Sequence, residues 1–289
     1  MKVRDRRDGC VHYSALRHMK QSPAHYRHYC ETPFEPTPAM LLGTLVHVEL
    51  FGHQPGRTIA VWEGKRRNET GYQVWKSERL AAARNDGLEV TIVTLPEFER
   101  AQTIAEAVRA QDAMRPDGPL LFAEGCIYEV PLKWQDCGLE LATGGVDVLN
   151  RAKRYAVDFK TTTCTAPWRW SRFAWDMGYH VQAAMYERAL TSNGVDVTDL
   201  YCVGVEVDPP YAMTALKYSK PMLSVSINAD LLELGRREMT ELLERIKHCE
   251  ETNEWPAYTL APIEWVPPDH VVNRIQQHVS FDDEQETGT

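Results

Sequence analysis

The chain has no long apolar segment, no paired cysteines and no excess of positive charge. Its 289 residues contain no apolar run of 18, so no transmembrane helix is expected. The opening MKVRDRRDGC lacks the apolar core of a secretory signal. Seven cysteines are scattered without a Cys-x-x-Cys pair, which is typical of reduced thiols in a cytosolic protein. These absences predict a cytoplasmic protein that does not associate with a membrane.

Negative charge predominates, with 41 acidic residues against 32 lysines and arginines and a net charge of −9. On this number alone nucleic acid is not the expected partner, because phosphate binding needs local positive charge. A basic groove on an acidic body is still compatible with this net charge.

The end of the chain has a different composition. Four of the last eight residues are acidic and apolar periodicity is absent there. We therefore expect a domain over residues 1–260 and an acidic, flexible tail over 261–289.

Strand patterns fill the centre of the chain and helical patterns lie before and after it. Strands are expected at 88–94, 126–134, 139–150, 154–162, 199–207 and 222–228. Helices are expected at 14–21, 24–30, 39–52, 72–85, 96–114, 178–190 and 230–251. Strands joined by short turns, with helices around them, predict an α/β fold with a mixed central β-sheet flanked by helices.

The stretch GGVDVLNRAKRYAVDFKTTT places two aspartates and a lysine inside strand-forming sequence, although aspartate is depleted in strands. A hairpin that turns at Ala152–Lys153 would set Asp147 opposite Asp158. Because side chains alternate along a strand, Lys160 would lie on the same face. The opposite, core-facing side would carry Val146, Val148, Val157 and Phe159.

Two carboxylates in opposed positions, with Cβ atoms about 5 Å apart, repel each other, and burial increases that cost. A hard divalent cation with oxygen ligands, typically Mg²⁺, would supply the missing positive charge. A nearby lysine could then orient or deprotonate a water, or stabilise charge on a phosphoryl oxygen. The alternative is a surface hairpin whose polar face is solvated, and the hairpin by itself does not decide between the two.

Further segments accompany the hairpin. GTLVHVELF carries His47 in a Gly-x-x-x-His helix pattern, and GYHVQAAMY carries Gln182 and Tyr186 in a Gln-x-x-x-Tyr pattern. Together with VDFKTT and the opening SALRHMKQSPAHYRHY, they resemble the PD-(D/E)XK nuclease superfamily, in particular its RecE-like branch of exonuclease VIII type. The resemblance extends from about residue 12 to residue 250 and implies a restriction-endonuclease-like core.

That resemblance implies Mg²⁺-dependent hydrolysis of phosphodiester bonds in linear double-stranded DNA, with Mn²⁺ as a substitute metal. RecE-type enzymes degrade DNA 5′→3′ and leave 3′ tails for a single-strand annealing protein in phage or prophage recombination. Relatives usually form a homo-oligomeric ring. By the same resemblance, Asp147, Asp158 and Lys160 would be catalytic. The metal would be held by His47, Asp147, Asp158 and the main-chain carbonyl of Phe159.

Glu129 in CIYEVPLKW is a further candidate metal ligand, because relatives often carry a glutamate on this strand. Its face depends on the strand register. Pairing with Gly145 would place Glu129 on the Asp147 side, and pairing with Gly144 would place it on the other side. A bulge at the two glycines would change the register again, so the sequence leaves both positions open.

Other candidates have plainer alternatives. His47 on a buried helix would, taken alone, be a core histidine, but the accompanying motifs favour a ligand. Gln182 and Tyr186 share a helix face and could hold Lys160 or contact a DNA phosphate. The scattered cysteines do not match the clustered set that some relatives use, so no iron–sulfur cluster is expected.

Two basic stretches are candidate DNA contacts. WRWSRFAW interleaves Arg169 and Arg172 with four aromatics, a pattern that could grip phosphates and stack bases, or form a hydrophobic helix with exposed arginines. Lys65, Arg66 and Arg67 could line a DNA channel or form a solvated basic loop.

Two other functions stay open at this point. One is an endonuclease, or a nuclease that prefers single strands, on the same core. The other is a DNA-binding or assembly protein whose catalytic site has decayed. The presence of His47, Asp147, Asp158 and Lys160 speaks against decay.

Overall fold

The computed structural model describes residues 3–4, 8–33, 35–52, 56–218, 231–259, 261 and 264. The chain divides into two compact units, Met1–Pro256 and Ala257–Thr289, and all the helices and strands named below belong to the first. Most of the expected tail and the strand expected at 222–228 lie outside the described residues. The domain boundary at residue 260 therefore stays a prediction.

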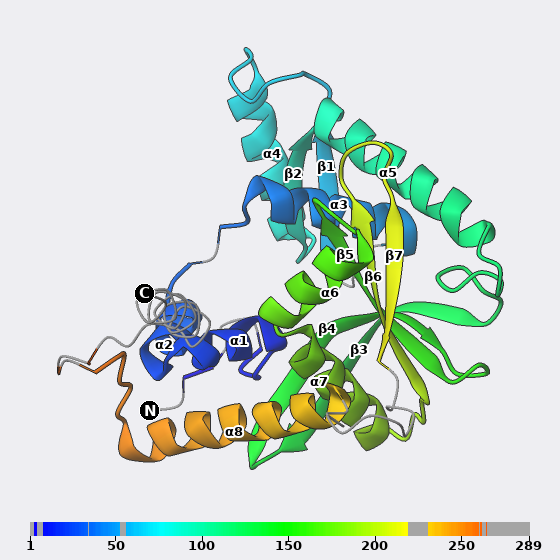
Figure 1. The fold of residues 1–289 in the computed structure, drawn as a ribbon. Helices are drawn as coiled ribbons and strands as arrows, with labels where there is room; N and C mark the ends of the chain where they lie inside the picture. Colours follow the sequence, from blue (N-terminus) through cyan, green and yellow to red (C-terminus); the bar gives the residue numbers. More distant parts are fainter. Residues whose placement is uncertain are drawn as a thin grey trace, which may run out of the picture. The chain divides into compact units, whose positions relative to one another are not determined.

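A five-stranded mixed sheet forms the centre of the first unit (Figure 1). Its strands lie in sequence order, and only the β5–β6 pair is parallel, whereas the other neighbours are antiparallel. The strands are β3 (Cys126–Asp136), β4 (Leu139–Asn150), β5 (Tyr155–Thr162), β6 (Asp199–Glu206) and β7 (Met213–Tyr218). The predicted mixed central sheet is confirmed.

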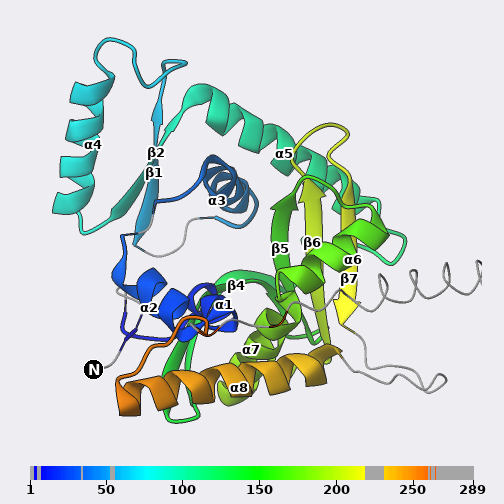
Figure 2. The ribbon, with the colours of Figure 1, turned by 60° about the vertical axis from the view of Figure 1, so that its left-hand side comes forward.

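Helices cover both faces of this sheet (Figure 2). The helices on one face are α1 (Tyr13–Gln21), α2 (Pro23–Glu31), α6 (Pro167–Asp176), α7 (Tyr179–Ser192) and α8 (Leu231–Thr252). Those on the other face are α3 (Pro38–Phe51) and α5 (Leu95–Ala113). Each face has its own apolar cluster, as expected for a sheet that buries both of its sides. Among the described residues, no helix is long and apolar enough to cross a membrane.

A separate βαβ unit precedes α5. Its strands β1 (Arg57–Trp62) and β2 (Glu89–Thr94) pair in parallel, and α4 (Tyr72–Asn85) connects them. The sequence patterns missed β1 and also β7. All six residues of β1 and the first four of β7 are half-buried, so neither strand shows the alternation of buried and exposed side chains that the prediction relied on.

Local signals fix the helix ends close to their predicted positions. Ser22 separates α1 from α2 and accepts a hydrogen bond from the backbone N–H of His25, with Pro23 at the first helical position. Thr94 and Glu97 form a capping box at the start of α5. Helix α3 was expected to be buried, but its first turn is exposed and Met40 is 44% accessible.

The β4–β5 hairpin has the predicted register, because Val148 pairs with Val157 and Asn150 with Tyr155. The ladder ends at the Val148–Val157 pair, just before the two aspartates. The expected core face is right for Val148, Val157 and Phe159, which pack with α3 and α5. It is wrong for Val146, which packs in the cluster on the α7 side.

The exception coincides with an irregularity between Val148 and Val146, where the ladder shows no Glu129–Asp147 pair and Glu129 has a φ of 49°. A β-bulge follows on the other side of Val146. Val130 pairs with Val146 but Leu132 pairs with Thr143, so Gly144 and Gly145 together oppose Pro131. The extra residue on β4 shifts which face its neighbours point to. A bulge at the two glycines, which the sequence left open, is thus present. Glu129 lies across from Asp147, so the register differs from both pairings considered from the sequence, with Gly145 and with Gly144.

The carboxylate of Asp112, at the end of α5, organises the loop before β3. It is completely buried and accepts hydrogen bonds from the backbone N–H groups of Leu120, Leu121 and Phe122, each at 3.0 Å.

We expect Asp112→Ala to lower the free energy of unfolding by about 3 kcal/mol or more, because three buried donors lose their acceptor. Urea denaturation measures this. Asp117→Ala, in the same loop but exposed, is the control, and an equal effect of both variants would contradict the assignment.

Candidate active site

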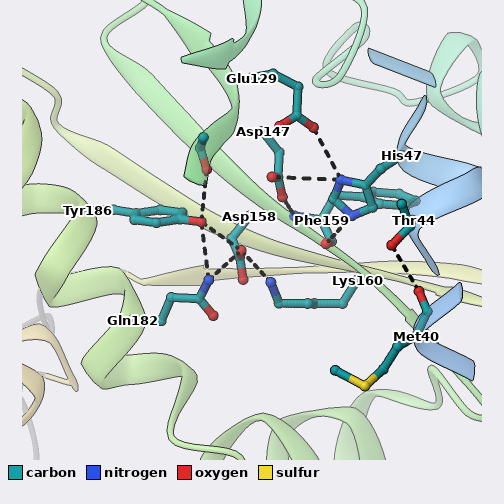
Figure 3. A network of polar contacts seen from close by, with 11 residues as sticks. Met40, Thr44, His47, Glu129, Asp147, Asp158, Phe159, Lys160, Gln182 and Tyr186 are labelled. Atoms are coloured by element: carbon teal, nitrogen blue, oxygen red, sulfur yellow. Dashed lines mark hydrogen bonds and ion pairs between the residues drawn. The ribbon is translucent and has the colours of Figure 1, made fainter. Parts of the chain in front are cut away.

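The candidate site lies where β4 and β5 separate (Figure 3). Beyond the last ladder pair, the main chain of Phe159 is no longer bonded to β4, and side chains take its polar groups instead. Its N–H donates to Asp147 Oδ2 at 2.6 Å, and its carbonyl oxygen lies 3.0 Å from His47 Nε2. His47 comes from α3 and Asp147 from β4, so two elements far apart in sequence meet at this gap.

His47, Glu129 and Asp147 form a compact group. His47 Nδ1 lies 3.5 Å from Glu129 Oε1 and 3.8 Å from Asp147 Oδ1. Glu129 and Asp147 are only 7% and 6% exposed. One potential ligand atom from each of the three residues lies within 4.8 Å of the other two. The alternative of a solvated polar face is therefore wrong.

Glu129 reaches this group because of the neighbouring bulge. The pairs Tyr128–Val148 and Val130–Val146 place Glu129 across from Asp147. Of the two positions that the sequence left open, Glu129 therefore takes the one on the Asp147 side. Its φ of 49° is in the left-handed region that few residues other than glycine adopt. A Cβ at Gly145 would lie 2.7 Å from Glu129 Oε2 and 3.1 Å from its main chain, so a larger residue there would have to displace Glu129.

Positive charge from His47 balances these carboxylates. Burial, together with the charge of Asp158, raises the pKa of Asp147 to about 6, although His47 acts in the opposite direction. Burial opposes protonation of His47, but the charges of Asp147 and Glu129 outweigh it and raise the His47 pKa. A protonated His47 thus supplies, in this arrangement, the positive charge that a bound cation would supply.

Asp158 is held by a second network. Its Oδ1 accepts hydrogen bonds from Lys160 Nζ at 2.6 Å and from Gln182 Nε2 at 3.1 Å. The Tyr186 hydroxyl lies 3.4 Å from the same oxygen and 3.2 Å from the Gly145 carbonyl. Gln182 also donates to the Tyr186 hydroxyl at 3.1 Å. The buried α7 pair therefore orients Asp158 rather than facing solvent.

Lys160 is a cation in this environment. Burial lowers its pKa, but the charge of Asp158, with further contributions from Tyr186 and Asp147, outweighs burial and holds the pKa well above its usual range. The ring of Tyr179 lies 5.4 Å from Lys160 Nζ. A protonated amine donates hydrogen bonds and stabilises negative charge, but it is not a base.

The donor set fits a hard divalent cation. Carboxylate oxygens suit Mg²⁺ and Mn²⁺, and an imidazole nitrogen is compatible with the latter. His47, Glu129 and Asp147 would hold such an ion. The carboxylate of Asp158 and the carbonyl of Phe159, the other ligands expected from the sequence, are engaged with Lys160 and His47 in this structure. Their role as ligands stays a prediction.

The predicted DNA contacts lie outside this cluster. Arg169 and Arg172 are exposed on α6, and Lys65 and Arg66 are exposed in the loop between β1 and α4. Their neighbour Arg67 forms a two-bond ion pair with Glu97 and ties that loop to α5. None of the described contacts joins these four basic residues to the cluster, and their role in DNA binding stays a prediction.

Two tyrosines near the site were not predicted. Tyr179 lies three residues before Gln182, so it shares the α7 face that carries Gln182 and Tyr186, and this spacing was a usable signal. The Tyr13 hydroxyl donates to the Met177 carbonyl at 2.6 Å. Burial raises the Tyr13 pKa, while the charge of Lys160 acts to lower it. No local pattern on α1 indicates that Tyr13 approaches the site.

Comparison with known proteins adds a family and a fold. The family described as "PDDEXK-like domain of unknown function (DUF3799)" matches residues 12–261. A crystal structure of a "Putative exonuclease" from Eubacterium rectale aligns with a TM-score of 0.54 and 13% identity, over 90% of each chain. The crystal structure of SSO0001 aligns with a TM-score of 0.30 and 9% identity, over 82% of this chain and 85% of that chain. The sequence matches no curated protein.

The raised pKa of Asp147 predicts that metal binding depends on pH. Without metal, ionisation of Asp147 costs stability; this cost is absent below pH 3.8 and becomes complete as the pH rises through about 6. A cation must displace the proton, so its affinity falls as the pH drops below about 6. We expect Mn²⁺ to raise the unfolding temperature more at pH 7.5 than at pH 5.

Thermal unfolding with and without Mn²⁺ measures this difference. Asp147→Asn should abolish the metal-dependent increase at both pH values, whereas Asp117→Asn, an exposed carboxylate outside the site, should preserve it. A metal effect that is independent of pH, or that survives in Asp147→Asn, would contradict the assignment.

Proposed function

Because this chain belongs to the family of PDDEXK-like domains, we propose that it is a divalent-metal-dependent deoxyribonuclease. The observation that carries the proposal is the buried group of His47, Glu129 and Asp147 beside the charged Lys160. An acidic, buried group with a cation next to it is costly to stability, and such groups cluster at functional sites. Family membership supports nuclease activity.

The residues have separate roles in this proposal. His47, Glu129, Asp147 and Asp158 hold the metal, with the Phe159 carbonyl completing the set. When bound, a divalent cation supplies positive charge beside the phosphodiester and makes a neighbouring water more acidic. Lys160 stays protonated, orients that water and stabilises charge on a phosphoryl oxygen. Gln182 and Tyr186 hold Asp158, and through it Lys160, in position.

We assign exonuclease action on linear duplex DNA to this site. Two lines support it: the RecE-like order of motifs, and the shared fold with a protein described as an exonuclease. Mg²⁺ as the working metal, 5′→3′ polarity, a homo-oligomeric ring, and a single-strand annealing partner in recombination follow from the resemblance alone. The cytoplasmic location likewise stays a prediction.

Decay of the site is the weaker alternative. A site that had lost its function would not need to retain a left-handed Glu129 or the close approach of Gly145 to that glutamate. An endonuclease on the same core would differ from an exonuclease in its substrates, because it would also cut covalently closed duplex.

Removing Lys160 tests the site. We expect Lys160→Ala to reduce cleavage of linear duplex DNA in Mg²⁺ by about 100-fold or more, because a preorganised positive charge next to the phosphate is lost. Lys153→Ala, an exposed lysine in the turn of the same hairpin, should cleave normally. Circular dichroism checks that both variants are folded. Unimpaired cleavage by folded Lys160→Ala would refute the assignment.

Digestion of end-labelled DNA tests the reaction type. We expect wild-type protein to degrade linear duplex in Mg²⁺, to release label from the 5′ ends first, and to be inactive in EDTA. Covalently closed duplex should remain intact, because it offers no end. Cleavage of the closed circle at a similar rate would establish an endonuclease instead.

A further inference from the structure

Helix α6 presents an unusual surface to solvent. It buries Trp170 and Ala174 at 0% and 7% exposure, while Trp168, Phe173 and Trp175 remain 73%, 41% and 47% exposed. An indole that is three-quarters exposed gains little from packing against its own chain. Trp168 therefore calls for an explanation beyond folding, and Phe173 and Trp175 on the same ten-residue helix are also more than a third exposed.

The exposed side chains are ordered along the helix. Trp168, Arg172 and Trp175 are spaced i, i+4 and i+7, so they form one stripe that extends about 10 Å along the axis. The buried Trp170 and Ala174 lie on the opposite side. The guanidinium of Arg169 lies 5.7 Å from the Trp168 ring, beside the stripe. The surface thus alternates flat aromatic faces with cations, and we call these four residues the α6 platform.

The platform carries positive charge on an acidic protein. The only acidic side chain of α6 is Asp176, which lies 3.8 Å from Arg172 in an exposed pair of little strength. Among the described contacts Arg169 has no ion pair. A polyanion is therefore the complementary partner, whereas an apolar protein partner would have to bury two arginines.

The platform is anchored to the candidate active site. Lys160 on β5 pairs with Gly204 on β6, and a Cβ at Gly204 would lie 2.7 Å from the Trp170 ring. Trp170 therefore rests directly on the sheet next to the position of Lys160. Tyr179 connects the two, because its ring lies 6.1 Å from Trp170 and 5.4 Å from Lys160 Nζ. The inner side of α6 borders the site while its outer side faces solvent.

One end of the platform is held rigid. The ring of Trp175 stacks on His180 at 4.4 Å with an interplanar angle of 12°. His180 Nε2 in turn lies 3.1 Å from Glu238 Oε2 on α8. An aromatic face fixed in this way loses little conformational freedom when a base stacks on its other side.

We propose that the α6 platform binds a DNA single strand, with unpaired bases stacked on Trp168 and Trp175 and its phosphates on Arg169 and Arg172. The single strand is favoured over duplex because a duplex hides the faces of its bases, so an exposed indole has nothing to stack on except at an end. The proposal rests on the proposed nuclease function, since the helix that carries the platform borders the site through Trp170 and Tyr179. It specifies which form of DNA the outer surface of α6 binds.

Binding in the cleavage-deficient Lys160→Ala background tests the platform separately from catalysis. Fluorescence anisotropy in EDTA compares labelled oligothymidine with a duplex that has hairpins at both ends. We expect Trp168→Ala and Trp175→Ala each to weaken oligothymidine binding by about 5- to 140-fold, the loss of one base–aromatic stack. Binding of the closed duplex should be unchanged. Trp168→Phe should retain most of the affinity, because a phenyl ring still stacks.

Two further variants control the measurement. Met114→Ala removes an apolar side chain that is also 73% exposed, at the end of α5, and should bind oligothymidine like the parent. Arg169→Gln should lower the salt dependence of oligothymidine binding by about 0.7 in the slope of log K against log salt, the loss of one phosphate contact.

Unchanged oligothymidine affinity in folded Trp168→Ala and Trp175→Ala would overturn the proposal, and so would an equal loss for the closed duplex. If α6 instead bound a protein, oligothymidine affinity would be unchanged in both tryptophan variants. Failure of the nuclease function looks different: wild-type protein would then leave DNA intact in Mg²⁺ while the tryptophan variants still showed the selective loss.

Discussion

The structure depends on balancing negative charge that is buried inside a β-sheet. Glu129, Asp147 and Asp158 are each less than a tenth exposed and lie on neighbouring strands. Their burial is tolerable only with positive charge at contact distance. Lys160 provides it for Asp158, and His47 provides it for Glu129 and Asp147. A divalent cation would meet the same requirement more strongly than a protonated imidazole, which is why the group is suited to bind one.

The layered fold makes this arrangement possible. Because β4 and β5 separate at the two aspartates, side chains from both faces of the sheet can meet there. Helix α3 brings His47 from one side, and α7 brings Gln182 and Tyr186 from the other. The bulge at Gly144–Gly145 lets Glu129 approach from the third strand. Each of these features weakens the sheet locally, so the site is built from departures from regular β structure.

The sequence predicted what depends on regular geometry. The two-residue alternation and the turn fixed the β4–β5 register, and helical spacing placed Gln182 and Tyr186 on one face. It could not fix Glu129, because the residue inserted at the glycine pair reverses the side chains beyond it. It also did not show the irregular backbone at Glu129, beside which Val146 packs on the α7 side. Nor could it show that Asp158 would be held by Lys160 and the α7 pair, since this depends on packing between distant segments. The roles of Lys65 and Arg66 rest on local composition alone.

The central claim is that the buried acidic group binds a divalent cation. Anomalous diffraction from crystals soaked in Mn²⁺ tests it most directly, because the signal locates the ion without relying on activity. The account predicts a peak in contact with Asp147 and bordered by His47 and Glu129, absent from crystals of Asp147→Asn. Wild-type crystals with no peak there, in which His47 still bonds to the Phe159 carbonyl and lies beside the two carboxylates, would contradict it.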